Sequence, residues 1–291
     1  MKRKVLLQLV VPLLSLCVLF LLLTMDPVRP NQPQKLLEIS VLFRQSDAAT
    51  WSEARQGMEQ AALDLNAELR FLTPAGEDLV PEQQELLERE AESGTNAILL
   101  IPADREALAD TVERITAAGT PVVTLETDMS AAGASACVGA DNAALGTALG
   151  QAALNGAPEG SQVVLLDFTA GPTGICDRIQ AAQAVLEAAG RRVSRCRPLE
   201  WESFADALDR TLTALSPAAV VAFDAADLEQ AAALLSGRED APLLYGAGST
   251  ATVAAYLEQS AIVSIAAQNE FAAGYLAVGA AVQAAAGQES F

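Results

Sequence analysis

Histidine is missing from this sequence, whose 291 residues contain none. Because histidine is the commonest general base and the commonest metal ligand, most hydrolase and metalloenzyme mechanisms lose their usual residues. Positive charge is also scarce, with 18 Lys and Arg against 37 Asp and Glu. A surface that binds phosphate backbones needs clustered Lys and Arg, so we expect no nucleic acid partner.

The four cysteines also lack the spacing of a metal site. Cys17, Cys137, Cys176 and Cys196 form no CxxC pair, so the sequence predicts no zinc and no other cofactor. A disulfide between Cys176 and Cys196 stays open in an oxidising compartment, although buried free thiols are favoured. Walker, GxGxxG and GxSxG motifs are absent, so neither a phosphate-binding loop nor a nucleophile elbow is expected.

The sequence begins with one long apolar run. Residues 5–25 carry no charge, and a helix of about 21 residues spans ~31 Å, close to the thickness of a hydrocarbon core. The run is longer than that of a cleavable signal peptide, and the basic residues before it favour a cytoplasmic N-terminus. We therefore predict a cytoplasmic tip at 1–4, a single-pass transmembrane signal anchor at 5–25, a linker at 26–37, and an extracellular or periplasmic domain after it.

In this domain, apolar segments of strand length alternate with segments rich in helix-forming residues. The predicted strands lie at 38–43, 69–73, 97–102, 121–126, 162–168, 192–196, 219–223, 242–246 and 261–267. Such alternation is typical of parallel sheets with crossover helices, and Asp141 is placed to cap the helix that follows it. We predict an α/β fold of two doubly wound parallel-sheet lobes, with binding loops at the carboxyl ends of the strands. The N-terminal lobe is expected at 38–140, completed by 268–287, the C-terminal lobe at 141–267, and a tail at 288–291.

Five motifs carry a resemblance to a known family. In chain order they are ISVLFRQSDAATWSEARQGMEQAA, GTNAILLIPAD, GTPVVTLETD, VGADNAALG and AIVSIAAQNEFAAGYLAV. Together they resemble the type I periplasmic binding proteins of the ribose- and galactose-binding kind, the substrate-binding proteins of sugar ABC transporters. The resemblance extends from residue 38 to about 287. It implies a ligand held between two lobes that close about a hinge near 139–141 and 266–269.

The resemblance also implies a set of ligand-binding residues: Arg44, Gln45, Trp51, Glu126, Thr127, Arg178, Trp201 and Gln268. Trp51 and Trp201 are the only tryptophans, and both fall at ring-stacking positions, so we expect them to face each other across the cleft. Glu126 stands where the family has an Asp that accepts from ligand hydroxyls. Arg178 matches an arginine that donates to ligand oxygens, and Gln268 matches an amide on the hinge side. A purely structural role stays open for each.

Three departures from the family pattern concern the identity of the ligand. Ala48, Ala226 and Gly248 stand where the family has polar residues. Since each buried charged hydrogen bond contributes about 1.5–3 kcal/mol, ribose or glucose is not expected to be the ligand. The family would also continue beyond the last helix with a segment that recrosses between the lobes. Its absence predicts looser lobe closure.

The function predicted from these features is that of an extracytoplasmic receptor that captures a sugar-like ring for the permease of an ABC importer. Two alternatives stay open, a membrane-tethered co-receptor for a sensor histidine kinase and a degenerate homologue that no longer binds. An enzyme is not expected. Glu126 and Asp128 form a carboxylate pair, but they lie two apart on one segment instead of flanking a bond as glycosidase carboxylates do.

Overall fold

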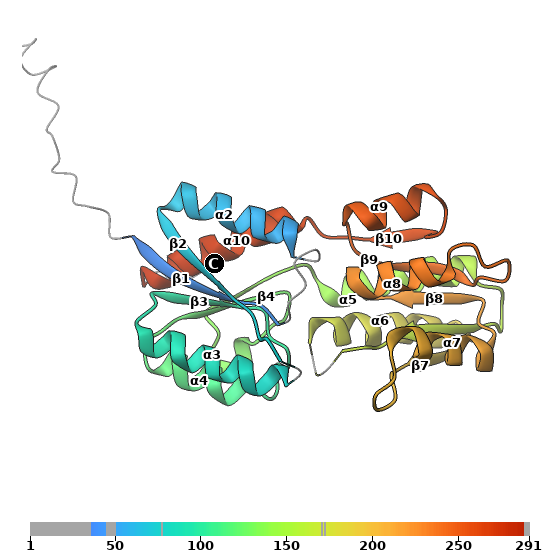
Figure 1. Ribbon diagram of the computed structural model, residues 1–291, viewed down its shortest axis with the longest axis horizontal. Helices are drawn as coiled ribbons and strands as arrows, with labels where there is room; N and C mark the ends of the chain where they lie inside the picture. The colour runs from blue at the N-terminus through green and yellow to red at the C-terminus, as the bar shows by residue number, and fades with distance from the viewer. Residues whose placement is uncertain (1–35, 45–50, 77, 170, 172, 288–291) are drawn as a thin grey trace, which may run out of the picture. The chain divides into compact units, whose positions relative to one another are not determined.

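The computed structural model describes residues 36–44, 51–76, 78–169, 171 and 173–287 (Figure 1). By its internal contacts the chain divides into two units, Met1–Leu36 and Leu37–Phe291. The predicted tip and anchor and most of the linker lie outside the described residues, so the anchor stays a prediction. Among the described residues, no helix combines the length and the apolar character needed to cross a membrane.

The first lobe is built on a parallel sheet of five strands in the order β2-β1-β3-β4-β5. The strands are β1 (Leu37–Leu42), β2 (Ala67–Leu72), β3 (Ala97–Leu100), β4 (Val122–Leu125) and β5 (Ala136–Val138). The central strands β3 and β4 are buried along their whole length, which explains why their sequences are apolar except for Thr124. The sequence did not predict β5, because this edge strand has only 3 residues and none of them is buried.

The second lobe repeats the architecture with the strand order β10-β9-β8-β6-β7. Its strands are β6 (Gln162–Leu166), β7 (Arg192–Cys196), β8 (Ala219–Ala222), β9 (Leu243–Ala247) and β10 (Ser264–Ala266). Every paired neighbour is parallel. The predicted fold class, two lobes with parallel sheets and crossover helices, is therefore confirmed.

Helices cover both faces of each sheet (Figure 1). In the first lobe, α2 (Ser52–Leu65) and α10 (Glu270–Ala285) pack on one face, and α3 (Leu79–Ser93) and α4 (Ala109–Ala117) on the other. In the second, α5 (Asn142–Gly156) and α6 (Gly174–Ala188) oppose α7 (Phe204–Leu215), α8 (Ala225–Leu235) and α9 (Ala251–Glu258). A short 3-10 helix, η1 (Ser130–Ala132), joins β4 to β5. The described cysteines Cys137, Cys176 and Cys196 are free thiols.

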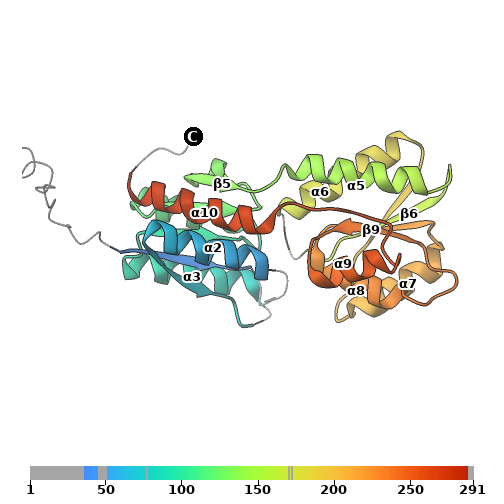
Figure 2. The ribbon, with the colours of Figure 1, turned by 90° about the horizontal axis from the view of Figure 1, so that it is seen from above.

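The chain crosses between the lobes twice within the described residues, from β5 to α5 and from β10 back to α10 (Figure 2). The two crossovers contact each other, because the Ala140 amide donates to Gln268 Oε1 at 2.8 Å. The Asp141 side chain accepts from the Ala144 amide at 2.9 Å and so caps α5, as the sequence predicts. The Asp141 side chain thereby stabilises the first turn of α5, directly after the crossover from β5.

Replacing Asp141 should destabilise the protein through this cap. We expect Asp141→Ala to lower the free energy of unfolding by about 1 kcal/mol, since an amide at the start of α5 loses its acceptor. Urea unfolding followed by circular dichroism measures the change. Asp240→Ala is the control, because Asp240 is exposed and makes no side-chain hydrogen bond to a described residue. Equal stability of both variants would show that the cap contributes nothing.

Candidate functional site

The candidate site lies where the carboxyl ends of strands from both sheets meet. Arg44 follows β1, Glu126 follows β4, and Asp224 comes two residues after β8. Polar residues collect at such ends because binding loops follow the strands of parallel sheets there. From the second lobe, Arg178 on α6 reaches the same place. Both lobes therefore contribute charged side chains to one site.

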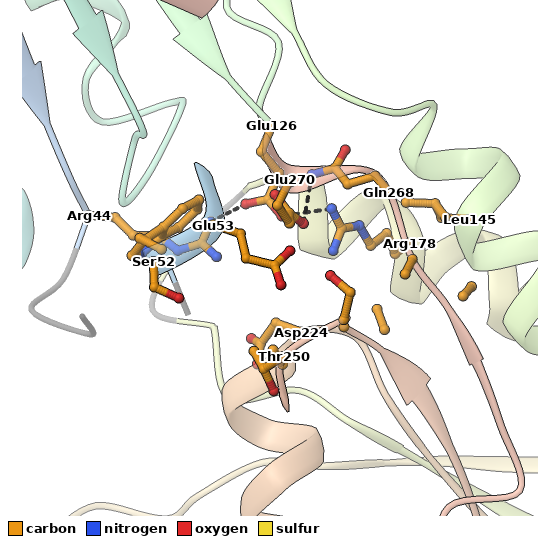
Figure 3. Close-up of a pocket in the computed structure, with 17 residues that line it drawn as sticks. Arg44, Ser52, Glu53, Glu126, Leu145, Arg178, Asp224, Thr250, Gln268 and Glu270 are labelled. Atoms are coloured by element: carbon orange, nitrogen blue, oxygen red, sulfur yellow. Dashed lines mark hydrogen bonds and ion pairs between the residues drawn. The ribbon is translucent and has the colours of Figure 1, made fainter. Parts of the chain in front are cut away.

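At the centre of the site, the Glu126 carboxylate lies between two guanidinium groups (Figure 3). Arg44 Nη1 donates to one oxygen and Arg178 Nη2 to the other, each at 2.6 Å. Glu126 is 7% exposed and Arg178 only 4%. Since Glu126 belongs to the first lobe and Arg178 to the second, this carboxylate ties the lobes together through a buried ion pair.

The electrostatics of Glu126 follow from this position. Burial by itself would raise its pKa, but the positive charges of Arg44 and Arg178 outweigh burial and lower the pKa to about 2. For Arg44, the loss of solvent would lower the pKa, and the negative charges of Glu126 and Asp224 reverse this and raise it. Glu126 and Arg44 are thus both charged at neutral pH.

The backbone around Glu126 is tightly constrained. Glu126 has a left-handed φ of 68°, an uncommon conformation for a residue other than glycine. Asn142 Nδ2 donates to its carbonyl oxygen at 2.7 Å, and Asn142 Oδ1 accepts from Arg178 Nε at 2.7 Å. Gly174 of the second lobe lies so close that a Cβ there would collide with the same carbonyl oxygen. The surrounding structure therefore sets the direction of the Glu126 side chain.

Two cavities adjoin the ion-paired group, and both are lined by Arg44 and Asp224. The first, the hinge cavity, has a volume of about 40 Å³, room for a few water molecules. It is lined by Arg44, Trp51, Ser52, Glu53, Glu126, Leu145, Arg178, Asp224, Ala225, Ala247, Gly248, Ser249, Thr250, Ala266, Ala267, Gln268 and Glu270. The second, the acidic cavity, has a volume of about 250 Å³. Its lining consists of Arg44, Leu79, Ala103, Phe168, Thr169, Thr173, Ile175, Asp224, Ala226, Asp227 and Gln230.

Several carboxyl groups at these cavities hold protons unusually tightly. Burial and the nearby charge of Asp224 raise the pKa of Asp227 to about 8, against a smaller opposing effect of Arg44. Burial likewise raises the pKa of Asp224. Burial also raises the pKa of Glu270 to about 7, although its hydrogen bond from Gln268 acts in the opposite direction. These carboxyls have lost water without gaining enough positive charge in return.

The structure brings together five of the residues predicted from the sequence. The hinge cavity is lined by Arg44, Trp51, Glu126, Arg178 and Gln268. Gln268 Nε2 donates to Glu270 while Gln268 Oε1 holds the other crossover. Their role in ligand binding stays a prediction.

Three predicted residues do not line a cavity or cannot be placed. Thr127 is fully buried, and its hydroxyl accepts from the Gly174 amide at 3.1 Å, so it joins the lobes instead of facing a cavity. Gln45 lies outside the described residues, as does Ala48. Trp201 is 88% exposed and lies in a turn between β7 and α7 with a φ of 64°.

The expectation that the two tryptophans face each other is therefore wrong. Trp51 is 6% exposed and packs with Phe43 in the core of the first lobe, with ring centroids 5.7 Å apart. Trp201 lies in a surface turn where the Leu199 amide donates to Glu202 Oε2 at 2.8 Å. Trp201 matches the family pattern in sequence position, but its turn directs the side chain into solvent.

The sequence analysis also missed Asp224 and Glu270. We expected Ala226 and Asp227 to stand for a polar pair of the family, with its first polar side chain lost. In the structure, Asp224 takes the strand-end position and caps α8, accepting from the Asp227 amide at 2.8 Å. The signal was present as an acidic residue directly after the apolar run AVVAF. Gly248, in contrast, does line the hinge cavity without a side chain.

Comparison with known proteins identifies the family. Residues 39–289 match the model of the periplasmic binding protein domain. The chain belongs to the periplasmic binding protein family. No curated protein matches it in sequence.

Solved structures of the same fold agree with this assignment. GanP, a glucose-galactose binding protein from Geobacillus stearothermophilus, is 20% identical with a TM-score of 0.76, over 89% of this chain and 94% of that one. A carbohydrate transporter solute-binding protein from Agrobacterium radiobacter, in complex with D-arabinose, is 18% identical with a TM-score of 0.80, over 89% and 91%. An ABC transporter solute-binding protein from Agrobacterium vitis with bound D-fucose is 18% identical with a TM-score of 0.79, over 87% and 91%. At such identities the likeness shows a shared fold.

In this periplasmic binding protein, Glu126 does not provide the general acid that a glycosidase needs. Glu126, with a pKa of about 2, stays ionised at neutral pH and cannot donate a proton. Asp128 is exposed and accepts from the Ser130 amide at 2.8 Å, away from both cavities. The arrangement suits noncovalent binding.

Removing the charge of Glu126 should be costly. Glu126→Gln leaves two buried guanidinium groups without their counter-charge, so we expect the free energy of unfolding to fall by about 3–5 kcal/mol in urea titrations. Glu59→Gln is the matched control, because the Arg55–Glu59 ion pair is exposed and should contribute less than about 1 kcal/mol. A Glu126→Gln variant as stable as this control would contradict a central role for the ion pair.

The raised carboxyl pKa values predict that stability falls as pH rises. A carboxyl whose pKa is higher in the folded than in the unfolded protein binds its proton more tightly when folded. For Asp227 this stabilisation is lost between its ordinary value of 3.8 and about 8. We expect the melting temperature to drop by several degrees from pH 5 to pH 8, while Glu126 stays ionised throughout.

Asp227→Asn should reduce this pH dependence, because the amide does not titrate. The charged neighbours of position 227 remain in the variant, and these are Asp224, Asp167 and Arg44. Part of the decrease in melting temperature with pH should also remain, because the pKa values of Asp224 and Glu270 are raised as well. Asp240→Asn should leave the wild-type profile unchanged. A wild-type melting temperature that rises from pH 5 to pH 8 would contradict the buried, protonated state.

Proposed function

We propose that the chain is an extracytoplasmic solute-binding receptor that captures a sugar-like, ring-containing molecule between its lobes. The observation that carries the proposal is that Arg44 and Glu126 from one lobe, and Arg178 and Asp224 from the other, line common cavities. Membership of the periplasmic binding protein family supports it. Proteins of the same fold with bound D-arabinose and D-fucose support a sugar-like ligand.

Capture requires the lobes to part first. The hinge cavity, at about 40 Å³, is too small for a ring, so a ligand must enter while the contacts between lobes are open. Those contacts include the Glu126–Arg178 ion pair, the hydrogen bond from the Gly174 amide to Thr127, and the Arg105–Asp177 pair, whose two hydrogen bonds measure 2.7 and 2.9 Å. The crossovers at 139–141 and 267–269 are where the backbone would flex. A ligand that binds only the closed form would shift the population towards it.

The closed form would be recognised by a partner in the membrane. The leading candidate is the permease of an ABC importer, which suits the family and the fold. A sensor kinase is the second candidate, because one chain of this fold was solved as part of a XylFII–LytSN complex, at 16% identity and a TM-score of 0.77. An anchor at 5–25 would keep the receptor beside either partner.

Intrinsic fluorescence tests ligand capture with two matched variants. A screen of pentoses, hexoses, amino sugars, nucleosides and polyols against the full-length chain should find a ligand that raises the melting temperature and shifts tryptophan emission. We expect Trp201→Phe to keep the emission shift and Trp51→Phe to lose it, because only Trp51 lines a cavity.

Two outcomes would contradict the proposal. If no compound in the screen changes either signal, the chain is a homologue that has lost binding. If Trp201→Phe abolishes the shift while Trp51→Phe keeps it, the ligand binds outside the cleft described above.

A further inference from the structure

The charges around the two cavities do not balance. Two guanidinium groups, those of Arg44 and Arg178, line them. Against these stand five carboxyl groups, which belong to Glu53, Glu126, Asp224, Asp227 and Glu270. In Figure 3, Glu53 extends into the space between the ion-paired group and Asp224. Carboxyl groups therefore outnumber guanidinium groups in the lining, and an occupant with a positive charge would allow the protonated carboxyls to ionise beside it.

Both arginines already pair with Glu126, and Arg178 is engaged at every guanidinium nitrogen. Each guanidinium nitrogen of Arg178 donates a hydrogen bond, to Asn142 Oδ1, to the Phe223 carbonyl oxygen and to Glu126. Arg44 donates to Glu126, and its guanidinium carbon lies 5.1 Å from the centre of the Trp51 ring. A ligand with a negative charge would have to displace Glu126 to pair with Arg178. Such a ligand is disfavoured.

Unpaired acceptors line the acidic cavity. The Asp227 carboxyl accepts no hydrogen bond from any other described residue, and Asp224 uses one oxygen, Oδ1, for the Asp227 amide. Both line the acidic cavity, where burial raises the pKa of each. Both side chains are half-buried, and a carboxylate that has lost water without gaining a partner is costly, a cost that a cation beside it reduces.

The acidic cavity also has the shape and lining for a small ring. Its volume of about 250 Å³ is slightly below the range of roughly 300–1,000 Å³ typical of drug-sized ligands. Leu79, Phe168 and Ile175 give it apolar walls, while Asp224 and Asp227 supply a polar edge. A ring with an apolar face and a donor-bearing edge matches this division.

An independent observation comes from Trp51 in the hinge cavity. Its indole Nε1–H is buried and has no hydrogen-bond partner among the described residues. Buried donors are almost always satisfied in native proteins, so this atom indicates an acceptor on a bound molecule. The ligand should therefore carry an oxygen acceptor as well as a cationic donor.

We propose that the cleft selects a small polyhydroxylated ring bearing a protonated amine, an amino sugar, with the ammonium group in the acidic cavity beside Asp224 and Asp227. This inference rests on the proposed receptor function and specifies its ligand class. The ammonium group donates to both carboxylates, and a ring oxygen or hydroxyl oxygen accepts from Trp51. The Arg44–Glu126–Arg178 group stays intact beneath it.

Isothermal titration of the full-length chain at pH 6.5 with matched sugar pairs tests the ligand class. The pairs are D-glucosamine and D-glucose, D-galactosamine and D-galactose, and D-mannosamine and D-mannose, each differing at one substituent. In at least one pair we expect the amine to bind about tenfold more tightly or better. Asp227→Asn should reduce that ratio about tenfold, and Asp240→Asn, on the exposed surface of the same lobe, should preserve it.

A second measurement on the wild-type protein avoids any folding defect of the variant. Titration in buffers of different ionisation enthalpy should show that the amine, and not its neutral counterpart, releases a proton from the protein on binding. This is expected because a protonated carboxyl must ionise to pair with the ammonium group.

The outcomes separate this inference from the receptor function. A neutral sugar that binds as tightly as its amine would overturn the amine assignment and leave the receptor intact. An unchanged ratio in a folded Asp227→Asn variant, or binding without proton release, would also overturn it. If neither member of any pair binds and the broader screen is also silent, both the amine assignment and the receptor function fail.

Discussion

The structure depends on one buried carboxylate shared between two arginines. Glu126 neutralises Arg44 within its own lobe and Arg178 in the other, at 2.6 Å in each case. A buried ion pair gains little net stability over an apolar contact, but losing one partner leaves an uncompensated charge. The ion pairs therefore specify the arrangement of the site more than they add to its net stability. Without any one of the three side chains, a buried charge at the site would lack its counter-charge.

The Arg44–Glu126–Arg178 group leaves fewer charged donors in the cleft for a ligand. A sugar-binding cleft ordinarily offers charged groups to ligand hydroxyls, whereas here the protein has already satisfied its own arginines. What remains is a set of carboxyls, of which Asp227 and Glu270 have pKa values of about 8 and about 7. In the proposed receptor, the protonation of these groups, and not the arginines, would govern which ligand is accepted and at what pH.

The sequence predicted the fold well because the signals of a doubly wound fold are local and repeated. Buried strands such as β3 and β4 are apolar except for Thr124, and Asp141 marks the start of the helix that follows the last strand of the first lobe. Glu126, Arg178 and Gln268 line one cavity, since each is attached to an element whose end the pattern marks, and their role in ligand binding stays a prediction. Strand β5 was not predicted, because an edge strand of 3 exposed or half-exposed residues has no continuous apolar sequence.

The site was predicted less completely, because side-chain direction depends on contacts that spacing does not contain. Trp201 has the right residue type near the right place, yet its turn directs it into solvent. Asp224 directly follows the predicted strand at 219–223 and was not named as a site residue, although its side chain both caps α8 and lines two cavities. The pairing of Glu126 with two arginines joins positions separated by 82 and 52 residues, and no local rule links them.

The close approach of Gly174 to the Glu126 carbonyl oxygen has a geometric consequence for the whole receptor. The N-terminal residue of α6 meets the strand end of the opposite lobe at a point where even a methyl group has no room. The absence of a Cβ at Gly174 allows the two lobes to approach this closely. A larger residue at position 174 would hold them further apart. A substitution at position 174 would therefore change the separation of the lobes without changing any side chain that lines the cavities.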